Sequence, residues 1–200
     1  DVVQQADQLY RPYFVQQGTG RPVGMVFRDL LISDKVGFTY SGTPGDVAAD
    51  DLMERLRDIQ VQLKAENASG PHLVTVLLDG ENAWENYDND GKAFLNALYQ
   101  RLTDATDIVT ITPSEYLAKF PDQRKIESLW PGCWFTPDYS TWIGEEEENT
   151  AWNYLVKTRT MLINRRNTVA AKTYDAAMEL MYFAEGSDWF WWYGSDQSVA

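Results

Sequence analysis

Short apolar runs and helical stripes alternate along the first part of the chain. Three apolar runs predict β-strands at 23–27, 72–78 and 108–111. The middle run carries no charged residue and reads as a buried parallel strand. Helical spacing and a capping box predict helices over 46–67, 91–102 and 112–120. This repeated alternation of strand and helix is typical of parallel βαβ units.

The character of the chain changes after residue 120. Residues 121–144 are a long irregular stretch rich in Trp, Pro and Gly, and loops of this length in compact domains are usually functional. Two amphipathic helices are predicted next, over about 152–163 and 174–181. The run Glu145 to Glu148 precedes the first of them, where negative charge favours the helix dipole. The alternative is that these carboxylates face a cleft.

These patterns together predict an α/β fold in two parts. Residues 1–120 read as the carboxyl-side part of a parallel (β/α) barrel, and residues 121–200 as an aromatic-rich loop and helical region. Three strands cannot close a barrel, and an all-parallel sheet has to be covered on both faces. We therefore expect further parallel strands in polypeptide that precedes residue 1.

The charge of the chain limits its partners. The net charge is −13 and is evenly spread: residues 1–100 carry 15 acidic and 8 basic residues, and residues 101–200 carry 15 and 9. A uniformly acidic surface repels phosphate backbones and anionic lipid, so neither nucleic acid nor membrane is an expected partner. No apolar stretch approaches the ~20 residues of a membrane span, and the first residues lack the pattern of a signal peptide, so we expect neither a membrane span nor a signal peptide. A cytoplasmic protein is the expectation.

Two residue types limit the chemistry. Cys133 is the only cysteine, so neither an intrachain disulfide nor a thiolate metal cluster can form within the chain. His72 is the only histidine, and it starts the middle apolar run, away from the end where catalysis is expected. We expect a structural role for His72, and no metal ion or other cofactor.

Aromatic residues are frequent, with 8 Trp, 11 Tyr and 8 Phe. For most individual rings, packing is the expected role. Others are more concentrated than a core requires, notably in the run from Trp189 to Tyr193. Flat rings stack on the apolar faces of pyranoses while neighbouring carboxylates bind the hydroxyls, so an acidic, aromatic-rich surface would suit an oligosaccharide cleft.

The end of the middle run carries the candidate chemistry. Asp79 and Glu81 follow the run directly, with Gly80 between them and Trp84 shortly after. Parallel sheets and α/β barrels place their chemistry at the carboxyl ends of strands, because the loops there can vary while the sheet stays rigid. A carboxylate beside a glycine and an aromatic ring is typical of sugar chemistry. The alternative is that the two acids only cap the turn into the next helix.

Six stretches together resemble glycoside hydrolase family 57, in the family's order and across nearly the whole chain. They are Phe27-Arg28-Asp29, Leu31 to Phe38, Leu78 to Glu85, Trp142-Ile143-Gly144, Ala151-Trp152 and Glu185 to Gly194. The resemblance implies an incomplete (β/α) barrel followed by a helical region. It also implies a retaining mechanism on α-glucans or maltooligosaccharides. In the family, the aspartate of the Asp-Gly-Glu motif is the general acid/base, so the resemblance implies this role for Asp79. It also implies that Asp188 lies at the site.

The resemblance has gaps that bear on function. The family's histidine-containing first motif and its nucleophilic glutamate, which lies well upstream of Asp-Gly-Glu, have no counterpart here. Leu30 stands where many relatives have a histidine. The implied enzyme portion therefore supplies the acid/base and part of the sugar cleft, and is inactive without the amino-terminal part of the enzyme. The alternative is a non-catalytic carbohydrate-binding or regulatory module of the same fold.

The stereochemistry of a retaining reaction separates the two acids. Such enzymes need two carboxyl groups about 5–5.5 Å apart on opposite sides of the scissile bond. Asp79 and Glu81, as residues i and i+2 of a strand, would be about 6.6 Å apart and approach a sugar from the same side. We therefore assign the acid/base to Asp79 and place the nucleophile outside the chain. Glu81 is expected to hold a sugar hydroxyl or to orient Asp79.

The remaining site candidates are assigned by residue type and position. Arg28 and Asp29, at the end of the first predicted strand, would pair with each other or bind hydroxyls, and pairing is the simpler role. Trp84 and Trp130 are the candidates for stacking on sugar rings. Three other tryptophans are expected to pack instead: Trp142, Trp152 and Trp189.

Overall fold

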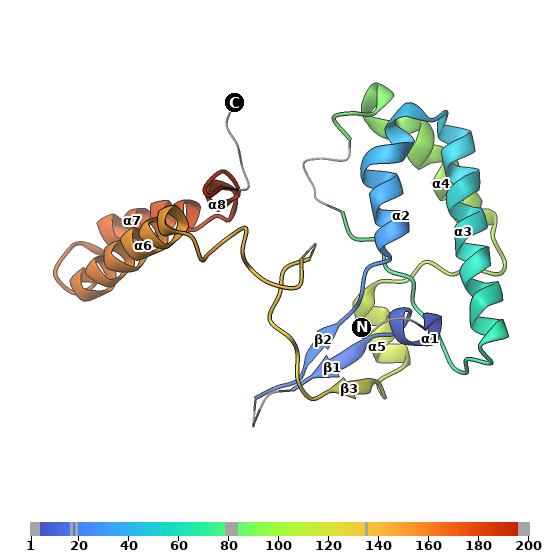
Figure 1. The fold of residues 1–200 in the computed structure, drawn as a ribbon, viewed down its shortest axis with the longest axis horizontal. Coiled ribbons are helices and arrows are strands. Elements are labelled where there is room, and N and C mark those ends of the chain that lie inside the picture. Colours follow the sequence, from blue (N-terminus) through green and yellow to red (C-terminus); the bar gives the residue numbers. More distant parts are fainter. Residues whose placement is uncertain (1–4, 17, 19, 79–83, 135, 196–200) are drawn as a thin grey trace. The chain divides into compact units, whose positions relative to one another are not determined.

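A computed structural model of the chain describes residues 5–16, 18, 20–78, 84–134 and 136–195. The fold is mixed α/β, mostly helical, with one small three-stranded sheet. The chain divides into two compact units, Asp1–Leu129 and Trp130–Ala200, here called unit 1 and unit 2 (Figure 1). No helix within the described ranges is long and apolar enough to cross a membrane.

The sheet of unit 1 is mixed in direction. β1 (Tyr13–Val15) pairs antiparallel with β2 (Val23–Met25) and parallel with β3 (Arg124–Ile126), which gives the order β2-β1-β3. β2 confirms the strand predicted at 23–27. The sequence does not predict β1 or β3, because three residues are too few to show an alternating pattern. The described sheet is therefore mixed rather than all-parallel, and the partial (β/α) barrel stays a prediction.

The helices of unit 1 agree better with the prediction. In chain order the helical segments are α1 (Ala6–Leu9), α2 (Leu30–Asp34), η1 (Lys35–Thr39), η2 (Tyr40–Gly42), α3 (Gly45–Ala65), η3 (Asp88–Gly91), α4 (Lys92–Asp104) and α5 (Pro113–Lys119). α3, α4 and α5 confirm the three helices predicted from spacing. α5 also has the predicted capping box, in which the Thr112 hydroxyl accepts the Glu115 N–H and the Glu115 carboxylate accepts the Thr112 N–H.

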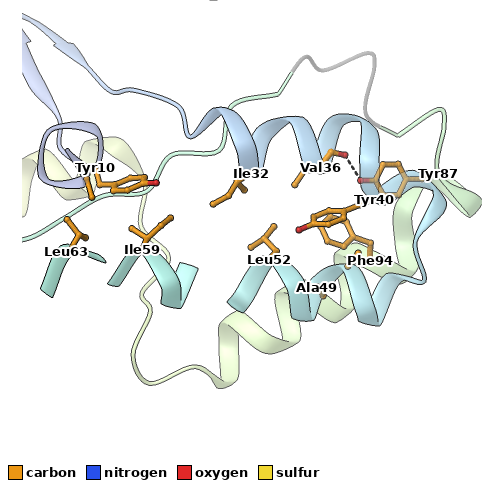
Figure 2. Close-up of a cluster of buried hydrophobic side chains, with 12 residues drawn as sticks. Tyr10, Ile32, Val36, Tyr40, Ala49, Leu52, Ile59, Leu63, Tyr87 and Phe94 are labelled. Carbon is orange, nitrogen blue, oxygen red and sulfur yellow. Dashed lines mark hydrogen bonds between the residues drawn. The ribbon is translucent and has the colours of Figure 1, made fainter. Parts of the chain in front are cut away.

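The core of unit 1 lies between α2 with η1, α3 and α4 (Figure 2). Its buried members include Ile32, Val36, Leu52, Ile59 and Phe94. α3 and α4 approach closely because Gly45 has no side chain: a Cβ there would lie 2.5 Å from the Phe94 backbone nitrogen. The Tyr87 hydroxyl donates to the Val36 carbonyl, so this polar group is satisfied inside the core (Figure 2).

The predicted strands at 72–78 and 108–111 differ from expectation. The first makes one parallel bridge, between Thr75 and Arg28, and the Asp29 N–H donates to the Thr75 carbonyl at 2.9 Å. Its parallel direction is as predicted, but its last residues, 76–78, are exposed rather than buried. The run at 108–111 forms no strand, and Val109 is 80% exposed. Apolar runs form buried strands only where neighbouring strands cover them, and the described residues supply too few.

Among the described residues, the middle run makes backbone hydrogen bonds along only one of its two edges. The Leu73 N–H donates to the Tyr10 carbonyl at 2.8 Å, and the Leu77 N–H donates to Ser33 Oγ at 3.4 Å. These are odd-numbered residues, whose backbone groups point to one side of an extended segment. For the even-numbered residues Val74, Val76 and Leu78, the described part of the chain contains no hydrogen-bond partner.

An apolar cavity of about 990 Å³ lies beside this run within unit 1. Its walls come from α3, α4 and the two apolar runs at 72–78 and 108–111, through residues such as Leu56, Val74, Val76, Leu98 and Ile108. The core of unit 1 is therefore closely packed between its helices and incompletely filled where the predicted strands lie.

Unit 2 is helical after an irregular entry. Its helices are α6 (Glu146–Arg165), α7 (Ala171–Ala184) and the short α8 (Asp188–Trp191). α6 and α7 confirm the two predicted amphipathic helices, and they pack against each other (Figure 1). Several of their apolar side chains are nonetheless exposed, among them Tyr154, Val156, Ile163, Leu180 and Phe183.

Candidate functional site

Two predicted strand ends lie side by side in unit 1 and run in the same direction. Arg28 pairs with Thr75 in a parallel bridge, so the chain continues past both residues toward the same edge. Asp29 follows the first run directly, and Asp79 follows the second in the sequence. Asp79 and Glu81 themselves lie outside the described residues.

Asp29 is buried and engaged by its own unit. It is 7% exposed and forms the N-cap of α2, with Oδ1 accepting the Ile32 N–H at 2.8 Å. Its Oδ2 accepts the Tyr10 hydroxyl at 2.5 Å. Burial and the neighbouring Asp29 carboxylate raise the pKa of Tyr10 above its usual value, so the tyrosine remains a donor at neutral pH. Both oxygens of Asp29 are therefore engaged within unit 1, and its low exposure leaves little of the carboxylate surface for a sugar hydroxyl.

Arg28 forms an ion pair with a residue that the sequence does not single out. Its Nη2 lies 3.7 Å from Oδ1 of Asp34, at the end of α2. The sequence favours pairing between Arg28 and Asp29, whereas the hydrogen bonds of Asp29 go to Tyr10 and Ile32. The prediction is therefore right about ion pairing and wrong about the partner.

Trp84, the first described residue after the acidic pair, is half-buried against the core of unit 1. Its ring lies 5.4 Å from the Tyr87 ring, tilted by 55°. A Cβ on Gly91 would lie 2.9 Å from Cε3 of Trp84, and Gly91 has a φ of +70°, which favours glycine. The turn before α4 thus fixes the ring while leaving part of its surface accessible.

Trp130 lies at the start of unit 2 and displays its ring to solvent. It is 76% exposed, and its Nε1–H donates to the Pro137 carbonyl at 2.7 Å. The same loop is closed by the Cys133 N–H, which donates to the Asp138 carbonyl at 3.0 Å. The Asp138 carboxylate in turn accepts the N–H and hydroxyl of Ser140. The hydrogen bonds of this loop therefore hold the exposed indole of Trp130 in place.

α8 places the aromatic side chains near the end of unit 2 on two faces, one exposed and one buried. Trp189 and Trp192 are 56% and 66% exposed, whereas Phe190 is buried and Trp191 is half-buried. Residues i and i+3 share a face of a helix, so the two exposed indoles lie on the same side. Asp188, the first residue of α8, is also exposed. The prediction that Trp189 packs is wrong, and the three-residue spacing is the signal that reveals its exposure.

The other rings of the run anchor α8 to α6. Phe190 stacks on Trp152, with ring centroids 4.0 Å apart and planes inclined by 15°. The rings of Trp191 and Trp142 lie 5.6 Å apart, and the Trp152 Nε1–H donates to the Trp142 carbonyl at 2.8 Å. These contacts confirm the packing roles predicted for Trp142 and Trp152.

Comparison with known proteins settles the family. The family model for Glycosyl hydrolase family 57 matches residues 1–128, which is nearly the whole of unit 1. The chain belongs to glycosyl hydrolase family 57. A search of curated proteins gave no match to the chain.

Membership of family 57 makes the chain part of a glycosidase family whose substrates are carbohydrates. The site candidates within the matched residues are Arg28, Asp29, Asp79, Glu81 and Trp84. Trp130 and Asp188 lie beyond the match, in unit 2. Of the described candidates, the structure groups Arg28, Asp29 and Trp84 in one unit and the remaining two in the other.

The described part of this family 57 chain contains no group of three or more His, Cys, Asp or Glu side chains suited to a metal ion. Asp7 instead contacts three basic side chains: it accepts from Arg11 at 2.8 Å and Arg124 at 2.7 Å, and His72 Nε2 lies 2.9 Å from its Oδ1. Burial raises the pKa of Asp7, but the hydrogen bonds from His72, Arg11 and Arg124 outweigh it and hold this pKa well below its usual range. The cluster ties α1 to β3 and to the start of the middle run, which is a structural role for His72.

Proposed function

We propose that this chain supplies the general acid/base and part of the sugar cleft of a retaining enzyme that acts on α-glucans. Asp79 is the proposed acid/base. One observation carries the proposal: the parallel bridge between Arg28 and Thr75 gives a common direction to the two segments that lead into Phe-Arg-Asp and Asp-Gly-Glu. Both segments lie within the residues that match the family. A shared strand edge is where α/β enzymes carry their chemistry.

The proposed reaction has two steps. First, the Asp79 carboxyl gives its proton to the glycosidic oxygen while a carboxylate attacks the anomeric carbon. The bond to the leaving sugar breaks, and a glycosyl ester forms on the enzyme. Second, the Asp79 carboxylate takes a proton from water or from a sugar hydroxyl, whose oxygen attacks the anomeric carbon and releases the nucleophile. Hydrolysis and transglycosylation differ only in this acceptor.

The nucleophile must reach the anomeric carbon from the face opposite Asp79. Glu81 lies two residues further along and would share the side of Asp79, so its proposed role is to bind a hydroxyl or orient the acid/base. We place the nucleophilic carboxylate in polypeptide outside residues 1–200. The 200-residue chain by itself is then expected to lack turnover.

The open edge of the middle run supports a partial (β/α) barrel. The backbone groups of Val74 and Val76 have no partner within the described ranges, and an apolar cavity of about 990 Å³ adjoins them. Parallel strands in α/β proteins are apolar on both faces. Added strands would therefore form hydrogen bonds with the edge and fill the cavity with apolar side chains. We propose that such strands come from the polypeptide that carries the nucleophile.

Unit 2 is the proposed source of a sugar-stacking surface. The indoles of Trp130, Trp189 and Trp192 are exposed yet held by hydrogen bonds or by the rings that anchor α8. Asp188 adds an exposed carboxylate beside two of them. Within unit 1, the proposed binding residues are Arg28, Asp29, Glu81 and Trp84.

Turnover of maltooligosaccharides by the complete natural polypeptide tests this proposal. Asp79→Asn keeps the shape of the side chain but removes the proton, and general acid–base catalysis is worth about 10²–10⁴-fold. We expect kcat to fall by about 10³-fold while glucan binding is kept. Asp58→Asn, which changes an exposed carboxylate on α3, is the matched control and should leave kcat unchanged.

Two other outcomes would contradict the proposal. Wild-type turnover in Asp79→Asn would remove the acid/base from this position. Glucan binding by the complete polypeptide without turnover would favour the non-catalytic binding or regulatory module.

A further inference from the structure

The turn that follows α8 is held at the start of α6 by carboxylates. The Glu145 carboxylate accepts the Ser195 N–H at 2.9 Å and the Ser195 hydroxyl at 2.6 Å. The Glu147 carboxylate accepts the Gly194 N–H at 3.2 Å. Gly194 has a φ of +84°, a left-handed value that favours glycine and lets successive backbone N–H groups face the two acids. Residues about fifty apart in the sequence are thereby joined.

Glu148 supports this arrangement from inside the unit. It is fully buried, and its Oε2 accepts the Glu145 N–H at 3.1 Å, while the Glu145 side chain accepts the Glu148 N–H. This reciprocal capping box fixes the backbone and side chain of Glu145. Oε1 of Glu148 has no partner among the described residues, so this carboxylate is buried at a cost in free energy.

α8 needs such support because it is too short to hold itself. It has four residues, and a single helical turn is not stable alone. Phe190 and Trp191 fix it from beneath through Trp152 and Trp142. The two glutamates fix the chain at its end, and hydrogen bonds to a carboxylate are stronger than neutral ones.

We propose that Glu145 and Glu147 are positioning residues for the exposed pair Trp189 and Trp192. This rests on the proposed function, in which these indoles stack on an α-glucan. The carboxylates of the glutamate run then act through the backbone of residues 194–195 and do not bind sugar themselves. Loss of either acid frees the end of α8, and the two rings no longer keep one spacing.

The hydrogen bonds from residues 194–195 to Glu145 and Glu147 are here called the clamp. Hydrogen exchange at the Gly194 and Ser195 amides tests the clamp without any sugar. In the full chain, Glu145→Ala and Glu147→Ala should speed exchange at these amides by about tenfold, equivalent to about 1.4 kcal/mol. Glu147→Gln keeps the one accepting oxygen that is used and should restore protection, whereas Glu145→Gln keeps one of two and should restore part of it. Glu146→Ala removes the same charge from the same exposed turn without touching residues 194–195, and should change nothing.

Maltoheptaose binding, followed by tryptophan fluorescence of the same variants, tests the positioning role. Both alanine variants should raise Kd by about tenfold, and the glutamine variants should return it toward the wild-type value. Ser195→Ala removes one hydrogen bond without altering α6, so it keeps the test valid if an α6 variant misfolds, and it should weaken binding to a smaller degree.

Each remaining outcome counts against the proposal. Unchanged exchange in both alanine variants overturns the clamp, as does an equal effect of Glu146→Ala. Faster exchange with unchanged maltoheptaose affinity overturns the positioning role. A wild-type chain that binds no maltoheptaose overturns the sugar-stacking surface of the proposed function, and the exchange experiment then still judges the clamp separately.

Discussion

The two units of the chain bury their side chains in different ways. In unit 1, α2, α3 and α4 meet over a cluster of aliphatic and aromatic side chains, and the buried Asp29 has a partner for each oxygen. In unit 2, aromatic rings pack between α8 and α6, and α7 leaves Leu180 and Phe183 exposed. The buried carboxylate of Glu148 has an oxygen without a partner among the described residues.

The two units are therefore expected to owe their stability to different kinds of interaction. Unit 1 depends on close packing between helices, whereas unit 2 depends on a few stacks and hydrogen bonds around α8. The two can be followed separately, because Trp84 is the only tryptophan of unit 1 and all the others lie in unit 2. Tryptophan fluorescence therefore reports mainly on unit 2, and far-UV circular dichroism reports on the helices of both.

The largest effect is expected from Phe94→Ala in the core of unit 1. Phe94 is buried between Tyr40 and Tyr87, so its removal leaves a cavity and should lower the free energy of unfolding by about 3–5 kcal/mol. Tyr99→Ala, on an exposed face of the same helix, is the matched control and should change it by less than about 1 kcal/mol. Urea unfolding followed by circular dichroism measures both. An equal loss in the fluorescence transition would break the distinction between the units.

A smaller loss is expected from Asp7→Asn, and it depends on pH. The change removes the carboxylate that accepts from Arg11 and Arg124 and contacts His72, so unit 1 should become less stable by about 2–3 kcal/mol at pH 6. The folded pKa of Asp7 lies well below the unfolded value, so its contribution is present above pH ~4 and is lost as the pH falls further. The difference between wild type and variant should therefore shrink between pH 5 and pH 3. A difference that stays constant across this range would show that the carboxylate charge is not responsible.

Gly91→Ala tests how firmly the turn before α4 holds Trp84. The added Cβ would meet the indole at 2.9 Å and force a left-handed backbone on alanine, which costs about 1–2 kcal/mol. Unit 1 should lose about that much stability, and the fluorescence of Trp84 should shift toward a more exposed ring. Gly37→Ala, where a Cβ meets nothing within 4 Å, is the control. Equal stability of both variants would contradict the contact.

The smallest effect, of opposite sign, is expected from Glu148→Gln in unit 2. Glutamine keeps the capping box but removes a buried charge that neighbours three other glutamates. Stability should rise by up to about 1 kcal/mol relative to Glu146→Gln, which loses the same charge at an exposed position. Fluorescence-monitored unfolding of the two variants gives the comparison. A loss of more than about 1 kcal/mol in Glu148→Gln would mean that Oε1 of Glu148 has a partner outside the described residues.

The sequence predicts the helices well because their signal is local. α3, α4, α5, α6 and α7 all follow from apolar spacing or a capping box. The strands are predicted poorly: the runs at 72–78 and 108–111 are apolar, but burial depends on neighbours that no local pattern specifies. β1 and β3 are too short to leave a pattern.

The sequence predicts where the site residues lie along the fold more reliably than it predicts their hydrogen-bond and ion-pair partners. The parallel direction of the segments around Arg28 and Thr75 follows from the βαβ pattern. The hydroxyl of Tyr10 on Asp29 and the ion pair of Arg28 with Asp34 depend on how the chain folds back, so residue type alone does not reveal them. The exposure of Trp189 could be predicted by treating the aromatic run as a helical turn rather than as a block.

Chemical rescue tests the assignment of Asp79 most directly. In the complete polypeptide, Asp79→Ala should still cleave an aryl α-maltooside whose leaving group needs no proton, but the glycosyl-enzyme should then hydrolyse slowly because water lacks its base. Azide needs no base, so it should raise kcat and give the α-glycosyl azide, in which the anomeric configuration is retained. Absence of rescue, or an inverted β-azide, would contradict Asp79 as the acid/base of a retaining reaction.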